Sequence, residues 1–144
     1  MDIALHARRT LAFSNAMALP PLLYALGNGR TADAIFVAVA ACASIAMHLS
    51  DTKRGMDPGG WLAVHSSLLL NIDRAAAFTA ASYFGALWWN AGCSLGPAVC
   101  FVAGLLFSLL GEQSPFLSLY VAYHAAWHCV AFMCMYMVML LADK

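Results

Sequence analysis

The chain has 144 residues, about the size of one domain, and we expect a single domain over residues 1–144. Apolar residues make up 63% of it and charged residues only 10%, whereas a soluble domain carries roughly 25% charged residues. This composition excludes an ordinary soluble domain and predicts a protein embedded in a membrane. Seven basic side chains balance seven acidic ones without forming a basic run, so we expect no nucleic-acid partner.

Five apolar runs, separated by short polar or glycine-bearing joints, are long enough to cross a bilayer. We expect membrane-spanning helices at about residues 10–26, 33–50, 66–89, 94–111 and 115–141. Hydrocarbon offers no partner for backbone N–H and C=O groups, and the runs are too long and too uniformly apolar for the strands of a barrel. The predicted fold is therefore all-α, a polytopic bundle of about five transmembrane helices, in a multi-pass integral membrane protein.

The first span has two features of its own. Pro20 and Pro21 interrupt it, and we expect them to kink the helix because a proline within a helix removes a hydrogen bond and clashes with the preceding turn. The run also contains Asn15 and lacks a clear cleavage site, so we expect it to be retained and not removed as a signal peptide.

Basic residues favour the cytoplasmic or equivalent inner side of a membrane. An inner N-terminus places Arg8, Arg9, Lys53 and Arg54 inside, and Arg30 and Lys144 outside. This count favours an inner N-terminus.

The cysteines are odd in number and lie within apolar stretches, which argues against a disulfide framework. They are Cys42, Cys93, Cys100, Cys129 and Cys134. We expect them to be small buried residues.

Three histidines lie within predicted spans, where an ionisable group costs about 2.5–3.5 kcal/mol to insert and therefore needs a partner or a function. His124 and His128 are four residues apart, which puts both imidazoles on one helix face within reach of a single metal ion. That spacing alone also arises by chance in many helices. His48 lies near the inner end of the second span, with Ser44 one turn before it. With an inner N-terminus, all three histidines fall in the inner half of the bilayer.

Asp73 places a carboxylate within the third span, in the same half of the bilayer. Ala77, Ala81 and Gly85 follow it at four-residue intervals, and such a row of small residues lets another helix approach closely. We therefore expect Asp73 to point into the bundle.

Three histidines with an open fourth position form a catalytic type of zinc site. Beside it, Asp73 could orient or deprotonate the attacking water, and Ser44 could donate a hydrogen bond to the oxyanion.

Together these residues resemble the signature of the CREST superfamily, which includes alkaline ceramidases and the progestin and adipoQ receptors. The resemblance lies in the S-x3-H motif at Ser44 and His48, in Asp73, and in the H-x3-H motif at His124 and His128. It implies a multi-span helical protein in which the three histidines bind zinc. It also implies that Asp73 and Ser44 are the catalytic and hydrogen-bonding partners of the metal, since several members hydrolyse lipid amides.

The resemblance extends from about residue 11 to residue 140, and within the superfamily it is most similar to the myomaker-like branch. That similarity rests on Phe13, Ser14, Asn15 and Pro20 in the first span, and on His48, Leu49, Ser50 and Asp51 at the end of the second. Members of the superfamily usually have seven spans, and this chain has room for five. We therefore expect a shortened member.

Two functions are compatible with these residues. The first is an intramembrane, ceramidase-like zinc hydrolase that acts on a lipid amide taken from the membrane. The second is a non-catalytic membrane subunit of a larger complex, in which the zinc site is a structural clip. The small residues Gly92, Gly96 and Gly104 suit either close internal packing or a partner helix, which could belong to another protein or to a second copy of the chain.

Overall fold

The computed structural model describes residues 3–52, 56 and 58–144, and in this part of the chain all regular structure is helical. The helices are α1 (Ile3–Ser14), the 3-10 turn η1 (Asn15–Ala18), α2 (Leu19–Gly27), α3 (Thr31–Ser50), α4 (Gly60–Val64), α5 (Ser66–Asn90), α6 (Leu95–Gln113) and α7 (Leu117–Ala142). This arrangement confirms the all-α prediction. Lys53 and Arg54, on which the predicted orientation partly rests, lie outside the described residues.

Three helices of the described chain, α3, α6 and α7, are long and apolar enough to cross a membrane. Of the other helices the longest is α5, which has 25 residues and includes the polar side chains of Asn71, Asp73 and Arg74. The first apolar stretch is divided among α1, η1 and α2, which have 12, 4 and 9 residues. The fold is thus a bundle of helices with at least three candidate membrane spans.

The break in the first span lies one turn before the predicted kink. Pro20 and Pro21 are in the first turn of α2, where a missing N–H breaks no helical hydrogen bond, and the chain tightens into η1 just upstream of them. A proline ring clashes with the carbonyl four residues earlier, so a continuous α-helix cannot run directly into it. The prolines therefore displace the break to η1 and do not kink the helix at their own position.

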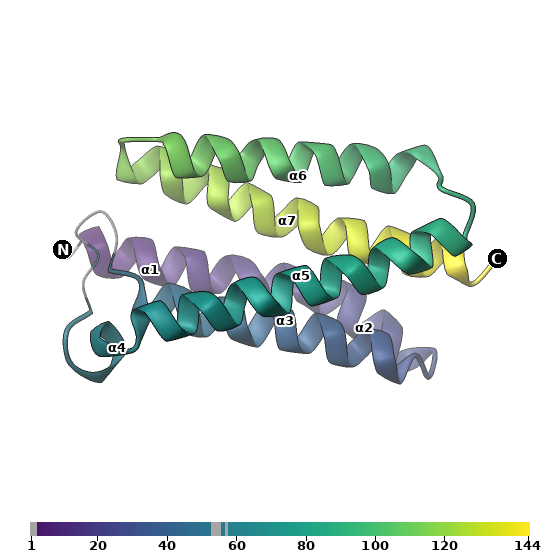
Figure 1. Ribbon diagram of the computed structural model, residues 1–144, viewed down its shortest axis with the longest axis horizontal. Coiled ribbons are helices and arrows are strands. Elements are labelled where there is room, and N and C mark those ends of the chain that lie inside the picture. Colours follow the sequence, from purple (N-terminus) through teal and green to yellow (C-terminus); the bar gives the residue numbers. More distant parts are fainter. Residues whose placement is uncertain (1–2, 53–55, 57) are drawn as a thin grey trace.

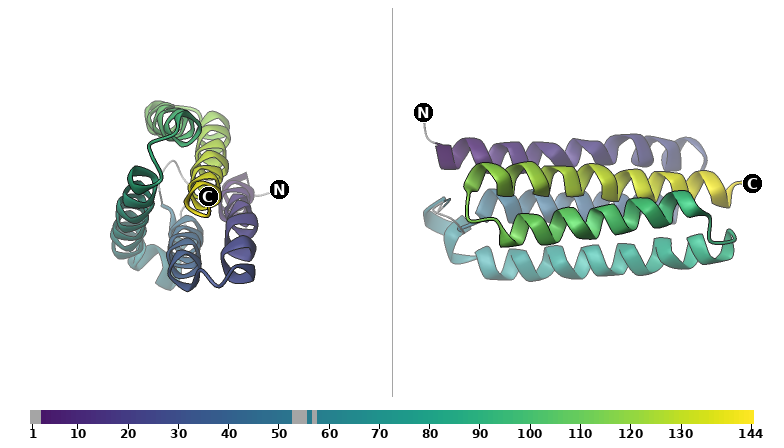
Figure 2. Two further views of the ribbon diagram at one scale, coloured as in Figure 1. Left: turned by 90° about the vertical axis from the view of Figure 1, so that its right-hand side faces the viewer. Right: turned by 90° about the horizontal axis from the view of Figure 1, so that it is seen from above.

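The helices run roughly parallel to one another in two groups (Figure 1). In one group α6 packs along α7, and in the other α5 packs along α3. The first segment, from α1 to α2, packs against both α3 and α7, as the end-on view shows (Figure 2). Small side chains on α3, among them Ala34, Val37 and Ala41, form much of the core where these helices meet.

Glycines on α6 explain how closely it approaches α7. A Cβ atom at Gly96 would lie 2.5 Å from the Cε atom of Met137, and one at Gly104 would lie 2.7 Å from the ring of Trp127. Of the two uses that the sequence left open for these residues, the structure shows close internal packing. Gly92 instead lies in the turn before α6, with a φ of +87° that a residue with a side chain rarely adopts.

The row of small residues on α5 behaves differently from the prediction. Ala77, Ala81 and Gly85 line a cavity together with Asp73. A Cβ atom at Gly85 would meet nothing within 4 Å. The expected helix contact along this row is therefore wrong, although the row does face the interior of the bundle. Small side chains here leave space open.

The outer faces of the bundle are apolar, with Leu23, Val99 and Leu106 among the exposed side chains. The five cysteines are free, as expected, but none of them is buried. Cys42 and Cys93 are exposed and the other three are half-buried. The burial prediction was wrong because apolar stretches in this bundle extend over its outer surface, so membership in such a stretch does not place a residue in the protein core.

A network of charged and hydroxyl groups, the Arg30 network, joins four helices at the end of the bundle where α3 begins and α7 ends. The Arg30 guanidinium forms ion pairs with Asp33 and with Asp143. The Tyr24 hydroxyl donates a hydrogen bond to Asp143, and the Tyr83 hydroxyl donates one to Asp33. Each charged group of the network therefore has at least one partner, and the network ties α2, α3 and α5 to the end of α7.

Candidate metal centre

The three predicted histidines meet at the opposite end of α3 from the Arg30 network. His48 lies in the last turn of α3, and His124 and His128 are one turn apart in the first half of α7. One ring nitrogen from each residue lies within 4.8 Å of the others. His48 and His128 are buried, with exposed fractions of 0% and 4%. The structure thus brings together residues that are up to 80 positions apart.

The spacing of these imidazoles fits a tetrahedral metal ion. The Nε2 atoms of His48 and His128 are 3.3 Å apart, and two nitrogens bound to zinc at about 2.0–2.1 Å with tetrahedral angles are separated by roughly 3.3 Å. The ring of His124 lies 4.8 Å from that of His48 and 5.0 Å from that of His128, centroid to centroid. These residues could therefore hold one divalent ion through ring nitrogens.

The buried Nδ1 atom of His48 has no hydrogen-bond partner in the part of the chain that the structure describes. A buried polar atom without a partner costs about 1–3 kcal/mol. A metal ion bound at Nε2 would leave this Nδ1 atom as it is, so the fit of a metal rests on the converging ring nitrogens of the three histidines.

Ser44 lies where the sequence predicted, beside the metal centre. It is buried on α3, one turn before His48, and its Oγ atom is 3.2 Å from Nε2 of His128. A hydroxyl at this position could donate a hydrogen bond to an oxygen of a molecule bound next to the histidines.

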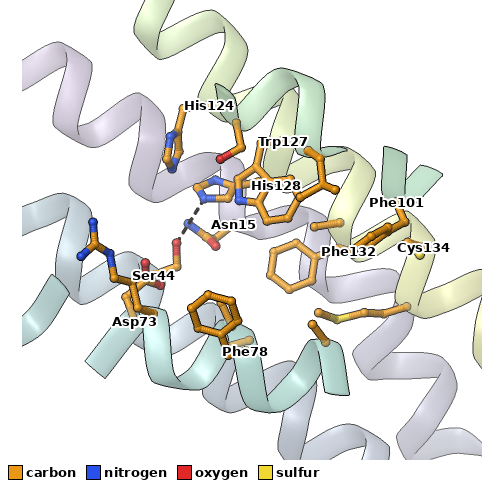
Figure 3. A pocket seen from close by; sticks show the side chains of 18 of the residues that line it. Asn15, Ser44, Asp73, Phe78, Phe101, His124, Trp127, His128, Phe132 and Cys134 are labelled. Atoms are coloured by element: carbon orange, nitrogen blue, oxygen red, sulfur yellow. Dashed lines mark hydrogen bonds between the residues drawn. The ribbon is translucent and has the colours of Figure 1, made fainter. Parts of the chain in front are cut away.

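Asp73 projects from α5, on the other side of a cavity that also has Ser44, His124 and His128 in its wall (Figure 3). The carboxylate is half-buried. This position agrees with the expectation that Asp73 points into the bundle. Its action on a metal-bound molecule stays a prediction.

The cavity has a volume of about 1090 Å³ and lies between the α3–α5 pair and the α6–α7 pair. Its wall is mainly apolar, and aromatic rings such as those of Phe78, Phe101 and Phe132 belong to it (Figure 3). Polar groups gather at the histidine end, while Trp88, Pro97 and other apolar residues line the far end. A long apolar chain attached to a polar group would match this distribution.

Two further polar residues belong to this region, and the sequence analysis did not assign them a role. The Oγ atom of Ser14, the last residue of α1, lies 2.6 Å from Nδ1 of His128. Asp51, at the end of α3, is buried and accepts a hydrogen bond of 3.2 Å from the Tyr120 hydroxyl. Ser14 directly precedes the break at η1, so a hydroxyl before a helix break is a signal that could have pointed to it, besides its part in the resemblance.

Comparison of the chain with models of protein families, with curated proteins and with solved structures gives no match.

Proposed function

We propose that the protein is an intramembrane zinc-dependent hydrolase of a lipid amide, a ceramidase-like and shortened relative of the CREST superfamily. One observation carries the proposal: three imidazoles have metal-binding spacing, and two of them, those of His124 and His128, lie in the wall of a large apolar cavity. A purely structural metal site needs no such cavity. A hydrolase that takes its substrate from the bilayer needs a metal centre next to a space for an acyl chain.

The proposal includes five membrane spans. Besides α3, α6 and α7, the 25 residues of α5 reach about 37 Å, more than the roughly 30 Å of a hydrocarbon core. The segment from α1 to α2 runs alongside the other helices over most of their length (Figure 2). In a membrane both would cross with the other helices, and their exposed apolar side chains would face lipid.

In this mechanism His48, His124 and His128 would hold a zinc ion, which when bound would supply Lewis acidity toward the amide carbonyl and the attacking water. Asp73 accepts a proton from the attacking water as the C–O bond forms. Asp73 then returns this proton to the amide nitrogen as the C–N bond breaks, which yields a fatty acid and an amine. The Ser44 hydroxyl donates a hydrogen bond to the carbonyl oxygen as negative charge develops on it.

The cavity contributes binding and exclusion of bulk water. Its apolar wall holds the acyl chain, and the position of the histidines at one end determines which bond of the ligand lies beside the metal. Low polarity around the metal centre strengthens the electrostatic interactions on which the reaction depends.

The test is release of fatty acid from a panel of acyl amides by purified protein, in detergent and in liposomes, with and without a zinc chelator. We expect release that the chelator abolishes and zinc restores. No zinc-dependent release from any amide, together with stable copurification of the protein in a larger membrane complex, would contradict the hydrolase. That result would support the alternative of a non-catalytic subunit with a structural zinc site.

A further inference from the structure

We propose that Ser14 fixes the tautomer of His128 so that the Nε2 atom of this histidine is free to bind the metal. Ser14 would then be a positioning residue of the metal centre, contributed by the first span. The inference rests on the proposed metal centre, but it concerns Nδ1 of His128, the ring nitrogen that faces away from the metal. It can therefore be tested on protein without metal.

The Ser14 hydroxyl has a single hydrogen to donate. Its Oγ atom is 2.7 Å from the backbone carbonyl of Leu11, which can only accept a hydrogen bond. The hydroxyl hydrogen therefore points at Leu11. The same Oγ atom is 2.6 Å from Nδ1 of His128, and in this contact it has only lone pairs to offer. Nδ1 of His128 must then carry a hydrogen and donate it to Ser14.

A neutral imidazole carries one N–H, so this assignment leaves Nε2 of His128 with a lone pair. Nε2 is 3.3 Å from Nε2 of His48 and 3.2 Å from Oγ of Ser44. The lone pair thus lies among the groups that would surround the metal. In the other tautomer a hydrogen on Nε2 would occupy this space. Metal-binding histidines commonly donate their second N–H to an oxygen acceptor, which fixes the ring and its tautomer.

The break in the first span explains why Ser14 can hold this orientation. Helix α1 ends at Ser14, and the Leu11 carbonyl receives a second hydrogen bond, of 3.2 Å, from Nδ2 of the buried residue Asn15. The η1 turn that follows packs against both α3 and α7. The half-buried Ser14 side chain is therefore held between its own helix and α7 by these contacts.

The experiment compares wild-type protein with Ser14→Ala, Ser14→Thr and Ser50→Ala. Ser50 is the matched control, because it is a buried serine whose hydroxyl also donates to the carbonyl three residues earlier, that of Met47. Nitrogen NMR of ¹⁵N-histidine-labelled, metal-free protein reports which ring nitrogen carries the hydrogen. The His128 signals are assigned from their loss in His128→Asn. Zinc affinity is measured on the same samples by competition with a chromogenic chelator.

We expect His128 to be protonated on Nδ1 in the wild type, in Ser14→Thr and in Ser50→Ala, and to become a mixture of tautomers in Ser14→Ala. Zinc affinity should fall about 10- to 100-fold in Ser14→Ala only. A wild-type His128 protonated on Nε2, or an unchanged tautomer in Ser14→Ala, would overturn the inference. If the wild type binds no zinc, the metal centre is wrong, and the spectra of the metal-free protein still decide whether Ser14 holds the tautomer.

Discussion

In the described part of the chain, two groups of polar side chains lie at opposite ends of α3, and they differ in how their members are paired. In the Arg30 network a guanidinium lies between two carboxylates, and each carboxylate also accepts a tyrosine hydroxyl. The histidine cluster brings three like groups together beside an apolar cavity. Paired charges of opposite sign need no further ligand, whereas converging imidazoles do. We infer that the Arg30 network stabilises the fold and that the histidine cluster binds a metal ion for catalysis.

The largest expected effect is the loss of turnover in Asp73→Asn, a change in the cavity wall that also holds two of the clustered histidines, and not in the Arg30 network. Turnover of a fatty-acyl amide should fall by about 10²-fold or more, because a neutral amide cannot accept the proton of the attacking water. Zinc should remain bound, since the three histidines are unchanged. Ser44→Ala should cost less, roughly five- to tenfold, because it removes one hydrogen bond worth about 1 kcal/mol. Initial rates of fatty-acid release and zinc content measure both, and full activity of Asp73→Asn would refute its role.

Arg30→Met should reduce stability and leave the metal centre intact. It removes the cation between Asp33 and Asp143, and Asp33 is only 2% exposed. Loss of one partner of a buried ion pair costs about 3 kcal/mol or more. Unfolding by a denaturing detergent, followed by circular dichroism, should show this loss. Unchanged stability would show that the network contributes little, and loss of zinc would show that the two groups are not independent.

Ala81→Phe tests the cavity without touching the metal. A phenyl ring at this position of the cavity wall should occupy the space for an acyl chain and weaken binding of a fluorescent acyl amide by about tenfold, which is 1.4 kcal/mol. Ala86→Phe is the control, because Ala86 is exposed on the same helix and does not line the cavity. Equal binding by both variants would place the acyl chain elsewhere.

The smallest effect concerns the pH dependence of the Arg30 network. The hydrogen bond from Tyr24, and then Arg30, hold the pKa of the Asp143 carboxyl below its ordinary value. A depressed pKa in the folded state stabilises the fold above the unfolded pKa, about 4, and this contribution is lost as pH falls through the folded pKa. Asp143→Asn should therefore unfold at a temperature that depends less on pH below about 4 than in the wild type. An unchanged pH profile would contradict this.

The sequence predicted the helical fold and the common face of His124 and His128 from local rules, whereas it predicted the approach of His48 from its depth in the bilayer and from the resemblance. Long, uniformly apolar runs in hydrocarbon form helices, and a helical spacing of four places two imidazoles on one face. It did not predict the cavity along Ala81 and Gly85, because small residues permit either close packing or open space. Distances between helices decide which occurs. The contact between Ser14 and His128 joins residues 114 positions apart and depends on a break displaced from the prolines, which periodicity does not reveal.

Metal analysis tests the central claim most directly. Zinc is measured in purified wild-type protein, in the double variant His124→Ala/His128→Ala, and in Arg30→Met, which changes the other polar group. We predict about one zinc ion per chain in the wild type and in Arg30→Met, and none in the double variant, because a single remaining imidazole cannot hold the ion. Stoichiometric zinc in the double variant, or a wild-type protein that binds no zinc, would contradict the assignment of the metal centre.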